Sequence, residues 1–266
     1  LVKTFKKNDN KYLIVSVTPY TLLAIIFLKV FKKKPFVYLR SDGHEEYKSI
    51  LGFYGPWIYH LMFSVAVKST LLIACRKHLL KGRNGKIVHP SHLNEKWFAN
   101  QKKTIIKSNT LLYVGRIRIE KGIFSLINIL KKSSLKLTIV TPEKENRISK
   151  LPDNILVVNF QNKNDSIITF YDTHSIFILP SFTEAHPQVL DEALARNKPV
   201  IIFQEISHVI RNRKGVFVTK RNIESLQETI NYITKNYETI QQDIKTNTLP
   251  TKIKFIEELR NIILEK

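Results

Sequence analysis

Two glutamates, Glu184 and Glu192, are separated by seven residues around an expected helix start. Pro187 between them suits the first helical position, where a missing N–H group costs nothing. Glu184 is therefore expected just before the helix and Glu192 inside it. The backbone N–H groups of Ala185 and His186 have no partner within the helix, and the helix dipole adds partial positive charge there. Such a place suits an anionic ligand that also carries hydroxyl groups.

A second group of residues with chemical potential lies earlier in the chain. Gly115 and Arg116 follow an apolar run, and Lys121 and Gly122 precede a segment of helical period. Glycine allows a ligand to approach the backbone closely, arginine can bind phosphate oxygens through two N–H groups, and lysine can neutralise them. The pattern indicates a diphosphate-binding turn, and a tight turn with two solvated cations is the alternative.

The elements that must position these residues alternate strands with helices. Apolar or β-branched runs predict strands at 12–17, 36–39, 71–75, 86–89, 110–114, 137–140, 155–158, 176–179, 200–203 and 216–218. Helical periodicity predicts helices at 122–131, 165–171, 187–196 and 224–235, and Asn197 can close the third of these in a left-handed conformation. This order predicts an α/β fold with parallel sheets that are covered on both faces.

In such a fold the candidate residues would meet at the carboxyl ends of the strands. Arg116, Lys121 and the loop from Ser181 to His186 all follow predicted strands. One glutamate could bind ribose hydroxyls and the other a sugar, with the diphosphate between them held by the cations. Together these residues indicate a nucleotide-sugar site.

The polar stretch 92–107 separates two series of strands and predicts two domains. We expect Rossmann-like domains at 1–103 and 104–248. The first has too few strands for a complete doubly wound domain, and the sequence opens without Met, so we expect its N-terminal domain to be truncated. Residues 249–266 are expected to form an amphipathic helix that packs across the domain junction.

Composition indicates an ordinary globular protein, with 43% hydrophobic and 24% charged residues. The single cysteine, Cys75, lies in an apolar run that favours core packing, and it cannot form an internal disulfide. We therefore expect a cytoplasmic protein in a reducing compartment. The apolar stretch from Pro56 to Cys75 contains His60 and Lys68, which favours a buried or membrane-surface helix over a transmembrane span.

Positive charge is concentrated in the first part of the chain. Residues 1–103 carry 19 Lys and Arg against 5 Asp and Glu, whereas residues 104–266 carry 24 against 17. The cluster Lys32, Lys33 and Lys34 beside the apolar run 22–30 favours peripheral contact with an anionic membrane. A Lys-rich composition without functional meaning is the alternative. Nucleic acid is not an expected partner, because aromatic residues do not interleave with the basic ones in a binding motif.

The motifs resemble those of the retaining family 4 glycosyltransferases of the GT-B fold, also called glycosyl transferases group 1. The resemblance lies in G-R-I-R-I-E-K-G at 115–122, P-S-F-T-E-A-H-P-Q-V-L-D-E-A at 180–193 and K-P-V-I at 198–201. It covers the second predicted domain well and extends loosely to 86–90. It implies two Rossmann-like domains, an acceptor-side one and a donor-side one.

The resemblance also implies roles for individual residues. Arg116 and Lys121 would hold the donor diphosphate, Glu184 would contact the donor sugar, and Glu192 would contact the ribose. The donor-binding residues expected on this basis are Gly115, Arg116, Lys121, Phe160, Ser181, Glu184, Ala185, His186, Pro187, Val189 and Glu192. The family more often has Gly-Phe-Gly after the first glutamate, where this chain has Ala185, His186 and Pro187. The implied reaction is hexosyl transfer with retention of anomeric configuration, in which Glu184, Arg116 and Lys121 take part at the catalytic centre.

Several other polar residues are candidates on their position. His44 follows the predicted strand 36–39 and is expected at the acceptor side or in catalysis, whereas Asp42, Glu45 and Glu46 suit a turn or helix start. The segment 159–161 could contact the nucleotide base. His89, His92, His174 and His208 lack metal-ligand spacing, and no D-x-D is present, so no metal and no cofactor are expected.

The leading interpretation is transfer of a sugar from a nucleotide-diphosphate donor to a glycan or lipid-linked acceptor in cell-envelope polysaccharide synthesis. A nucleotide-sugar epimerase or a phosphorylase on the same fold is the alternative enzyme. A truncated, non-catalytic binding module is the third possibility.

Overall fold

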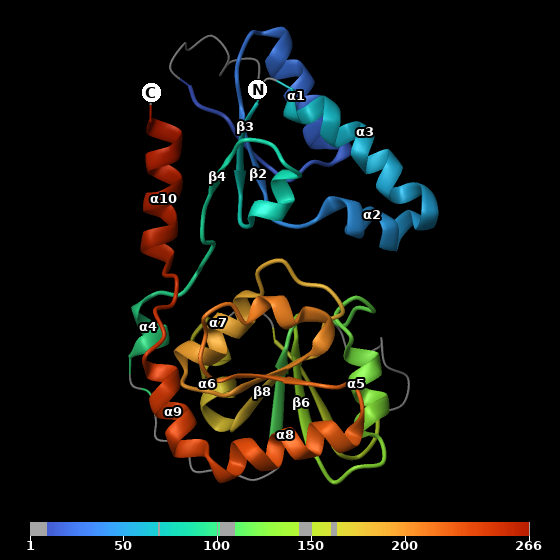
Figure 1. Ribbon diagram of the computed structural model, residues 1–266, viewed down its shortest axis with the longest axis vertical. Coiled ribbons are helices and arrows are strands. Elements are labelled where there is room, and N and C mark those ends of the chain that lie inside the picture. The colour runs from blue at the N-terminus through green and yellow to red at the C-terminus, as the bar shows by residue number, and fades with distance from the viewer. Residues whose placement is uncertain are drawn as a thin grey trace. The chain divides into compact units, whose positions relative to one another are not determined.

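A computed structural model describes residues 10–68, 70–99, 101, 110–143, 151–160 and 164–265 of the chain (Figure 1). By their contacts the residues divide into two compact units, the first formed by 1–91 with 252–266 and the second by 92–251. Each unit contains one parallel sheet with helices.

The first unit is built on a four-stranded sheet of order β1-β2-β3-β4. Its elements are β1 (Leu13–Val15), α1 (Pro19–Val30), β2 (Phe36–Leu39), α2 (Gly43–Leu51), η2 (Gly52–Tyr54), α3 (Gly55–Val67), β3 (Leu71–Ala74), η3 (Lys77–Leu80), β4 (Lys86–Ile87) and α10 (Lys252–Leu264). Strands β2 and β3 are the central pair and are almost wholly buried, which agrees with their continuous apolar sequences. Cys75 directly after β3 is buried, so the expectation of core packing is confirmed.

The C-terminal helix α10 belongs to this first unit. Phe255 lies 6.2 Å from the ring of Tyr38 in β2, measured between ring centroids. Glu258 accepts a hydrogen bond of 2.7 Å from the backbone N–H of His89. These contacts place one face of α10 on the sheet of the first unit.

The apolar stretch from Pro56 to Cys75 is divided between a helix and a strand. Helix α3 begins at Gly55, with Pro56 in its first turn, and ends at Val67, and β3 begins at Leu71. Among the residues that the structure describes, no helix has both the length and the apolar character needed to cross a bilayer.

The second unit is built on a six-stranded parallel sheet of order β10-β9-β8-β5-β6-β7. Its elements are α4 (Glu95–Phe98), β5 (Thr110–Val114), α5 (Ile123–Leu130), β6 (Lys136–Thr141), β7 (Ile155–Asn159), α6 (Asn164–Thr173), β8 (Ile176–Leu179), α7 (Gln188–Ala195), β9 (Val200–Phe203), η5 (Gln204–Val209), β10 (Val216–Thr219), α8 (Ile223–Lys235) and α9 (Tyr237–Lys245). The prediction of parallel sheets in an α/β fold is confirmed.

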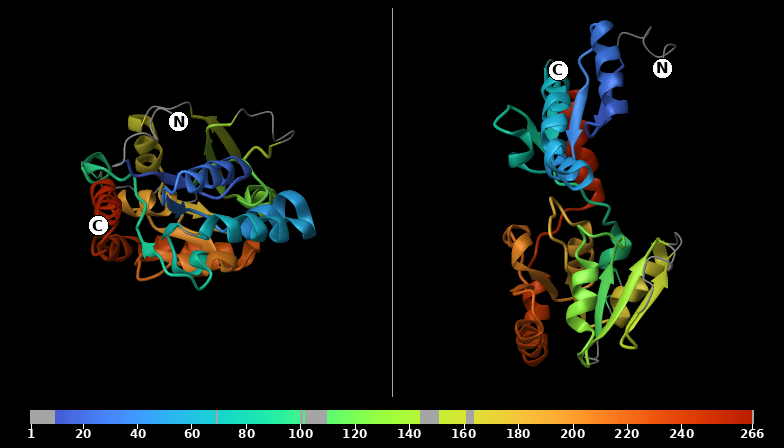
Figure 2. Two further views of the ribbon diagram at one scale, coloured as in Figure 1. Left: turned by 90° about the horizontal axis from the view of Figure 1, so that it is seen from above. Right: turned by 90° about the vertical axis from the view of Figure 1, so that its right-hand side faces the viewer.

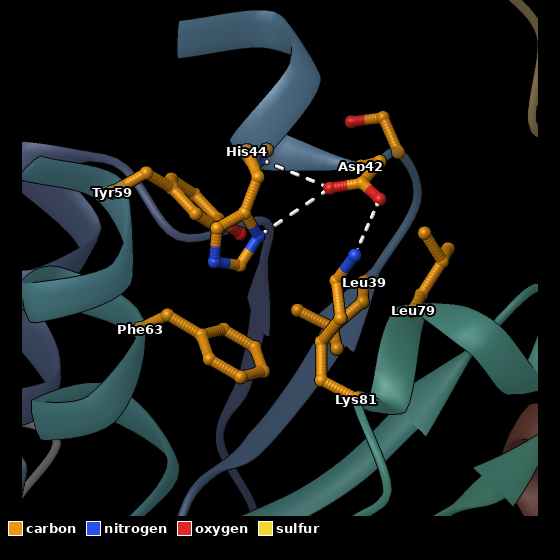
Figure 3. A pocket seen from close by; sticks show the side chains of 9 residues that line it. Leu39, Asp42, His44, Tyr59, Phe63, Leu79 and Lys81 are labelled. Atoms are coloured by element: carbon orange, nitrogen blue, oxygen red, sulfur yellow. Dashed lines mark hydrogen bonds and ion pairs between the residues drawn. The ribbon is translucent and has the colours of Figure 1, made fainter. Parts of the chain in front are cut away.

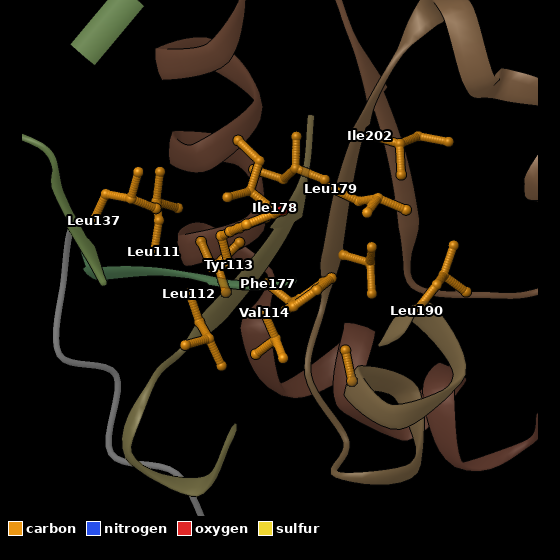
Figure 4. Close-up of a cluster of buried hydrophobic side chains, with 14 of the residues drawn as sticks. Leu111, Leu112, Tyr113, Val114, Leu137, Phe177, Ile178, Leu179, Leu190 and Ile202 are labelled. Carbon is orange, nitrogen blue, oxygen red and sulfur yellow. The ribbon is translucent and has the colours of Figure 1, made fainter. Parts of the chain in front are cut away.

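The core of the second unit is centred on β5 and β8. Tyr113 and Phe177 from these strands are almost completely excluded from solvent, and Leu190 from α7 packs into the same cluster (Figure 4). The segment before β5 joins this core, since the ring of Trp97 meets Tyr171 edge-on with 5.5 Å between centroids. Residues 92–99 therefore pack with the second unit, although the sequence pattern places the domain boundary at 103/104.

The strand order creates a switch point between β5 and β8. From β5 the chain proceeds through β6 to β7 on one side, and β8, β9 and β10 then extend the sheet on the other side. The loops that leave the carboxyl ends of β5 and β8 lie at this switch point, which is where open α/β sheets bind ligands. These two loops carry the residues that the sequence singles out.

Candidate functional site

The two loops at the switch point are joined by a charged contact. Lys121 Nζ, from the loop after β5, lies 2.6 Å from Glu184 Oε1, from the loop after β8. The hydroxyl of Ser181 donates to the same carboxylate oxygen at 2.7 Å. Glu184 and Lys121 are both largely shielded, with 11% and 24% of their side chains exposed, which strengthens the attraction compared with a surface pair. The structure thus brings together three of the predicted site residues.

Backbone contacts hold the same two loops against each other. The N–H of Phe182 donates to the carbonyl of Glu120 at 3.0 Å. Gly122 lies against Pro180 so closely that a Cβ atom on it would be 1.9 Å from the Pro180 carbonyl oxygen, and its φ is +66°. Only glycine fits this position, because it has no Cβ and tolerates positive φ. These backbone contacts therefore fix the spacing of the two loops that carry Lys121 and Glu184.

Hydrogen bonds with neighbouring side chains hold the turn that carries Arg116. The buried hydroxyl of Tyr113 donates to the Arg116 carbonyl at 2.8 Å, and a Cβ on Gly115 would lie 2.6 Å from that hydroxyl oxygen. Burial raises the pKa of Tyr113 above its usual value, so the hydroxyl stays protonated as a donor. Glu143, after β6, accepts from the N–H of Ile117 at 2.8 Å. The Arg116 side chain itself is exposed, and no ion pair holds it among the described residues, so it is available to an anion.

The expected helix start lies one residue later than the sequence indicates. Pro187 has ψ of 105° and is the N-cap residue, and α7 begins at Gln188. The prediction that Pro187 occupies the first helical position is therefore wrong. Glu184 lies before the helix and Glu192 within it as predicted, and Asn197 has φ of +60° directly after the helix as predicted.

Glu192 is buried in α7 with 5% of its side chain exposed. The hydroxyl of Tyr171 donates to Oε2 at 2.6 Å, and His92 Nε2 contacts Oε1. Burial raises the pKa of Tyr171 well above its usual value, and the neighbouring Glu192 carboxylate raises it further. Tyr171 and His92 thus hold the two carboxylate oxygens of Glu192 in place. The His92 side chain is 49% exposed to solvent.

Other predicted donor residues occupy the start of α7 and its surroundings. The ring of His186 is buried, with Nδ1 3.2 Å from Arg211 and Nε2 3.4 Å from Asp191. Asp191 in turn accepts two hydrogen bonds from Arg213, at 2.7 and 3.0 Å. Ala185 and Pro187 belong to the same loop, and Val189 packs against the hydrophobic core of the second unit.

Phe160 stands apart from this cluster. It follows the edge strand β7, which β6 separates from β5, and its ring meets Phe170 edge-on with 6.4 Å between centroids. Of the predicted base-contact segment 159–161, residue 161 lies outside the described residues. No contact links Phe160 to Lys121 or Glu184 in the described chain, and its role stays a prediction.

Arg221, after β10, holds the Glu184 loop, and the sequence pattern gave no sign of it. Its guanidinium lies 4.2 Å from the ring centroids of both Phe182 and Phe203. It donates to the carbonyls of Pro180 and Ser181 at 3.0 and 3.4 Å. The Glu205 carboxylate, 2.8 Å away, completes its environment. Arg221 is one of several basic residues around β10, such as Arg213 and Lys220, so its type and position alone do not distinguish it.

A separate polar cluster lies in the first unit, in a hollow that α2 and α3 line (Figure 3). Asp42 caps α2 by accepting from the His44 N–H at 3.0 Å, and its other oxygen lies 2.7 Å from Lys81 Nζ. Burial alone would raise the pKa of Asp42, but the Lys81 ammonium outweighs this and lowers it. The ring of His44 packs edge-on against Tyr59. Burial lowers the pKa of His44, although the Asp42 carboxylate acts in the opposite direction. The expectation that Asp42 begins a helix is confirmed.

The remaining histidines are dispersed. His89 pairs with Glu258 in the first unit, His174 Nε2 lies 2.8 Å from the Thr138 hydroxyl, and His208 donates to the Glu184 carbonyl at 2.8 Å. Across the described ranges, no three His, Cys, Asp or Glu side chains gather as metal ligands would.

Comparison with solved structures identifies the fold. The Anabaena protein HepE, in a structure with UDP and glucose, matches with a TM-score of 0.74 at 13% identity, over 100% of this chain and 81% of that one. WaaG, a glycosyltransferase involved in lipopolysaccharide biosynthesis, matches with a TM-score of 0.67 at 15% identity, over 99% and 94%. The fold is GT-B, with two Rossmann-like parallel sheets, as the resemblance implied.

Relatives by sequence agree with this fold. An uncharacterised glycosyltransferase of Haemophilus influenzae is 27% identical over 175 residues, which are 59% of this chain and 50% of that protein. The capsular polysaccharide biosynthesis glycosyltransferase CapM of Staphylococcus aureus is 31% identical over 149 residues, which are 51% and 39%. The match thus spans half or less of the length of these curated relatives. The profile of one family matches residues 95–248, more than half of the chain, and the chain belongs to that family, the glycosyl transferases group 1.

Proposed function

We propose that the chain takes part in transfer of a hexosyl group from a nucleotide-diphosphate sugar to a glycan or lipid-linked acceptor, with retention of anomeric configuration. The observation that carries the proposal is the Lys121–Glu184 contact of 2.6 Å at the switch point between β5 and β8. It joins a cation suited to a diphosphate with a carboxylate suited to sugar hydroxyls. The relative HepE was solved with UDP and glucose, which supports a donor of this class.

In the proposed reaction the bond between the anomeric carbon and the leaving phosphate oxygen breaks. The acceptor hydroxyl attacks from the same face, passes its proton to the departing phosphate oxygen and forms the new glycosidic bond. Negative charge grows on the departing diphosphate, so the most useful protein charges are those already fixed beside it. Arg116 and Lys121 supply these charges in the proposal. His44, in the first unit, is proposed as an acceptor-side or catalytic residue.

We further propose a role in cell-envelope polysaccharide synthesis at the cytoplasmic face of a membrane. Two relatives support this setting by their descriptions, CapM in capsular polysaccharide biosynthesis and TuaC of Bacillus subtilis in putative teichuronic acid biosynthesis. The single buried Cys75 and the basic first unit are compatible with it. Neither donor chemistry nor retention depends on this setting.

Donor binding tests the proposal first. Titration calorimetry with a panel of UDP and GDP sugars should give saturable binding that Lys121→Met weakens strongly. Lys132→Met, an exposed lysine beyond the other end of α5, is the matched control and should bind like wild type. A folded sample that binds none of the panel would overturn the proposal.

Product analysis then separates the possible enzymes. A transferase should release nucleoside diphosphate only with acceptor present, and proton NMR should show the donor's anomeric configuration in the product. Conversion of the donor sugar without acceptor would instead indicate an epimerase, and inversion of configuration would contradict retention.

A further inference from the structure

One edge of the first unit exposes an unusual group of large apolar side chains. These side chains come from the end of α2, from η2 and from the start of α3, and we call them the aromatic edge: Ile50, Leu51, Phe53, Tyr54, Trp57 and Leu61. Phe53 is 91% exposed, Trp57 73% and Tyr54 71%. Single exposed apolar residues are common in soluble proteins, but a contiguous group indicates an interaction surface.

The aromatic edge is built rigidly into the fold. A Cβ on Gly55 would lie 2.0 Å from the Tyr47 carbonyl oxygen, so the start of α3 is in direct contact with α2. The rings of Phe53 and Tyr54 meet edge-on, with 5.7 Å between centroids. The backbone that carries these side chains is therefore a tight turn between two packed helices.

Helix α3 is apolar on its outward face as well as its inward one. Its inward face buries Tyr59, Met62 and Phe63, and the rings of Tyr59 and Phe63 contact His44 of α2, whereas Trp57 and Leu61 are exposed. Helices that are apolar all round are normally covered on both faces. Helix α1 lies beside α3 (Figure 2), joined by a hydrogen bond of 2.7 Å from Lys29 Nζ to the Val65 carbonyl.

The unit that carries the edge is strongly basic, since residues 1–91 contain 16 Lys and Arg against 4 Asp and Glu. Lys48 of α2 is exposed beside the edge, as are Glu45 and Glu46, and residues 47–91 contain no Asp or Glu. The exposed Lys32 and Lys34 follow the neighbouring α1. Each Lys near an anionic bilayer is attracted to its surface. A second copy of this chain would instead bring the same positive charges together.

We propose that the aromatic edge docks onto the interface of an anionic lipid bilayer. Trp and Tyr rings favour the boundary between headgroups and acyl chains, and the lysines of the basic first unit would meet the headgroups. The His44 hollow is formed by the same two helices, through Asp42 and His44 of the α2 start and Tyr59 of α3. A lipid-linked acceptor held in the bilayer would then present its head group beside this hollow. Docking itself does not require glycosyl transfer, so it can fail or succeed independently of donor binding by the second unit.

The two tryptophans of the chain provide a direct test. Trp57 lies in the aromatic edge and is 73% exposed, whereas Trp97 lies in the core of the second unit and is 6% exposed. Phosphatidylcholine vesicles with and without phosphatidylglycerol are added to the whole chain. With phosphatidylglycerol the emission should shift to shorter wavelength, and acyl chains brominated near the headgroup should quench it. Trp57→Phe should abolish both responses, because only Trp97 remains.

Vesicle co-sedimentation measures the contribution of the edge to binding. Tyr54→Ser combined with Phe53→Ser should weaken binding to phosphatidylglycerol vesicles about tenfold or more, since two rings that would be buried in the bilayer are lost. Tyr232→Ser, an exposed tyrosine in α8 of the second unit, should leave binding unchanged. Binding that persists without a Trp57 response would show attachment elsewhere and overturn the proposal. Lipid-free dimers with blue-shifted Trp57 emission would also overturn it, since a second copy would then cover the edge.

Discussion

Replacing Gly122 with alanine should damage stability and nucleotide binding together. The added Cβ would lie 1.9 Å from the Pro180 carbonyl oxygen, at a residue with φ of +66°. The left-handed conformation costs a residue with a side chain roughly 1–2 kcal/mol, and a forced shift of packed backbone costs a further 1–3 kcal/mol or so. Gly122→Ala should therefore lower the free energy of unfolding by about 2–5 kcal/mol.

The effect on nucleotide binding follows from the loop that must move to make room for the new methyl group. The Pro180 carbonyl can escape the new methyl group only if the loop carrying Ser181 and Glu184 shifts away from Lys121. A shift that separates these loops weakens a charge-assisted hydrogen bond to the diphosphate worth roughly 1.5–3 kcal/mol, so UDP affinity should fall about tenfold or more. Stability is measured by urea unfolding followed through Trp97 fluorescence in a Trp57→Phe background, and affinity by calorimetry with UDP.

Gly215→Ala is the matched control in the same unit. Gly215 has φ of +80°, and its added Cβ would meet the side chain of Ile244 at 2.2 Å instead of a loop that carries site residues. Both variants should unfold at lower urea than wild type, but only Gly122→Ala should lose UDP affinity. A folded Gly122→Ala protein with wild-type affinity would refute the claim that this glycine sets the spacing of the two loops.

Three further perturbations test the surroundings of the site. Arg221→Lys removes the stacking of the planar guanidinium on Phe182 and its hydrogen bonds to the carbonyls of Pro180 and Ser181. We expect kcat/KM to fall about tenfold while circular dichroism shows a folded protein. Unchanged kinetics would exclude a positioning role. Tyr171→Phe leaves Oε2 of the buried Glu192 carboxylate without its donor, so the urea-derived free energy of unfolding should drop by roughly 1–3 kcal/mol, and a neutral result would contradict the bond. Burial lowers the pKa of Lys198 from 10.5 to about 8, so the unfolded chain binds one more proton between those values. Stability of wild type relative to Lys198→Met should rise by about 3 kcal/mol as pH increases through this window, and equal pH slopes would refute the buried-amine assignment.

Local patterns predicted the strands well, for a physical reason. Continuous apolar runs such as 36–39, 176–179 and 200–203 coincide with β2, β8 and β9, because strands buried on both faces need apolar residues at every position. The helix α7 was placed one residue early, since Pro187 suits either position locally and the loop before it is fixed by tertiary contacts. Helix α1 gives a weak sequence signal, as it is apolar on most sides and lacks a clear helical period.

The sequence alone predicts only part of the candidate site. The types and spacing of Arg116, Lys121, Glu184 and Glu192 indicated a donor site, because charge and helix-start chemistry are local properties. The pairing of Lys121 with Glu184 depends on β5 lying next to β8, which is a property of strand order. Arg221 shows the same limit, since its role arises only where β10 brings it to the Glu184 loop.

A crystal structure of the chain with UDP tests the central claim most directly. The account predicts the diphosphate at the carboxyl ends of β5 and β8, within hydrogen-bonding distance of Arg116 or Lys121, and the ribose beside Glu192. A nucleotide bound at another face of the second unit, with these side chains unengaged, would contradict it.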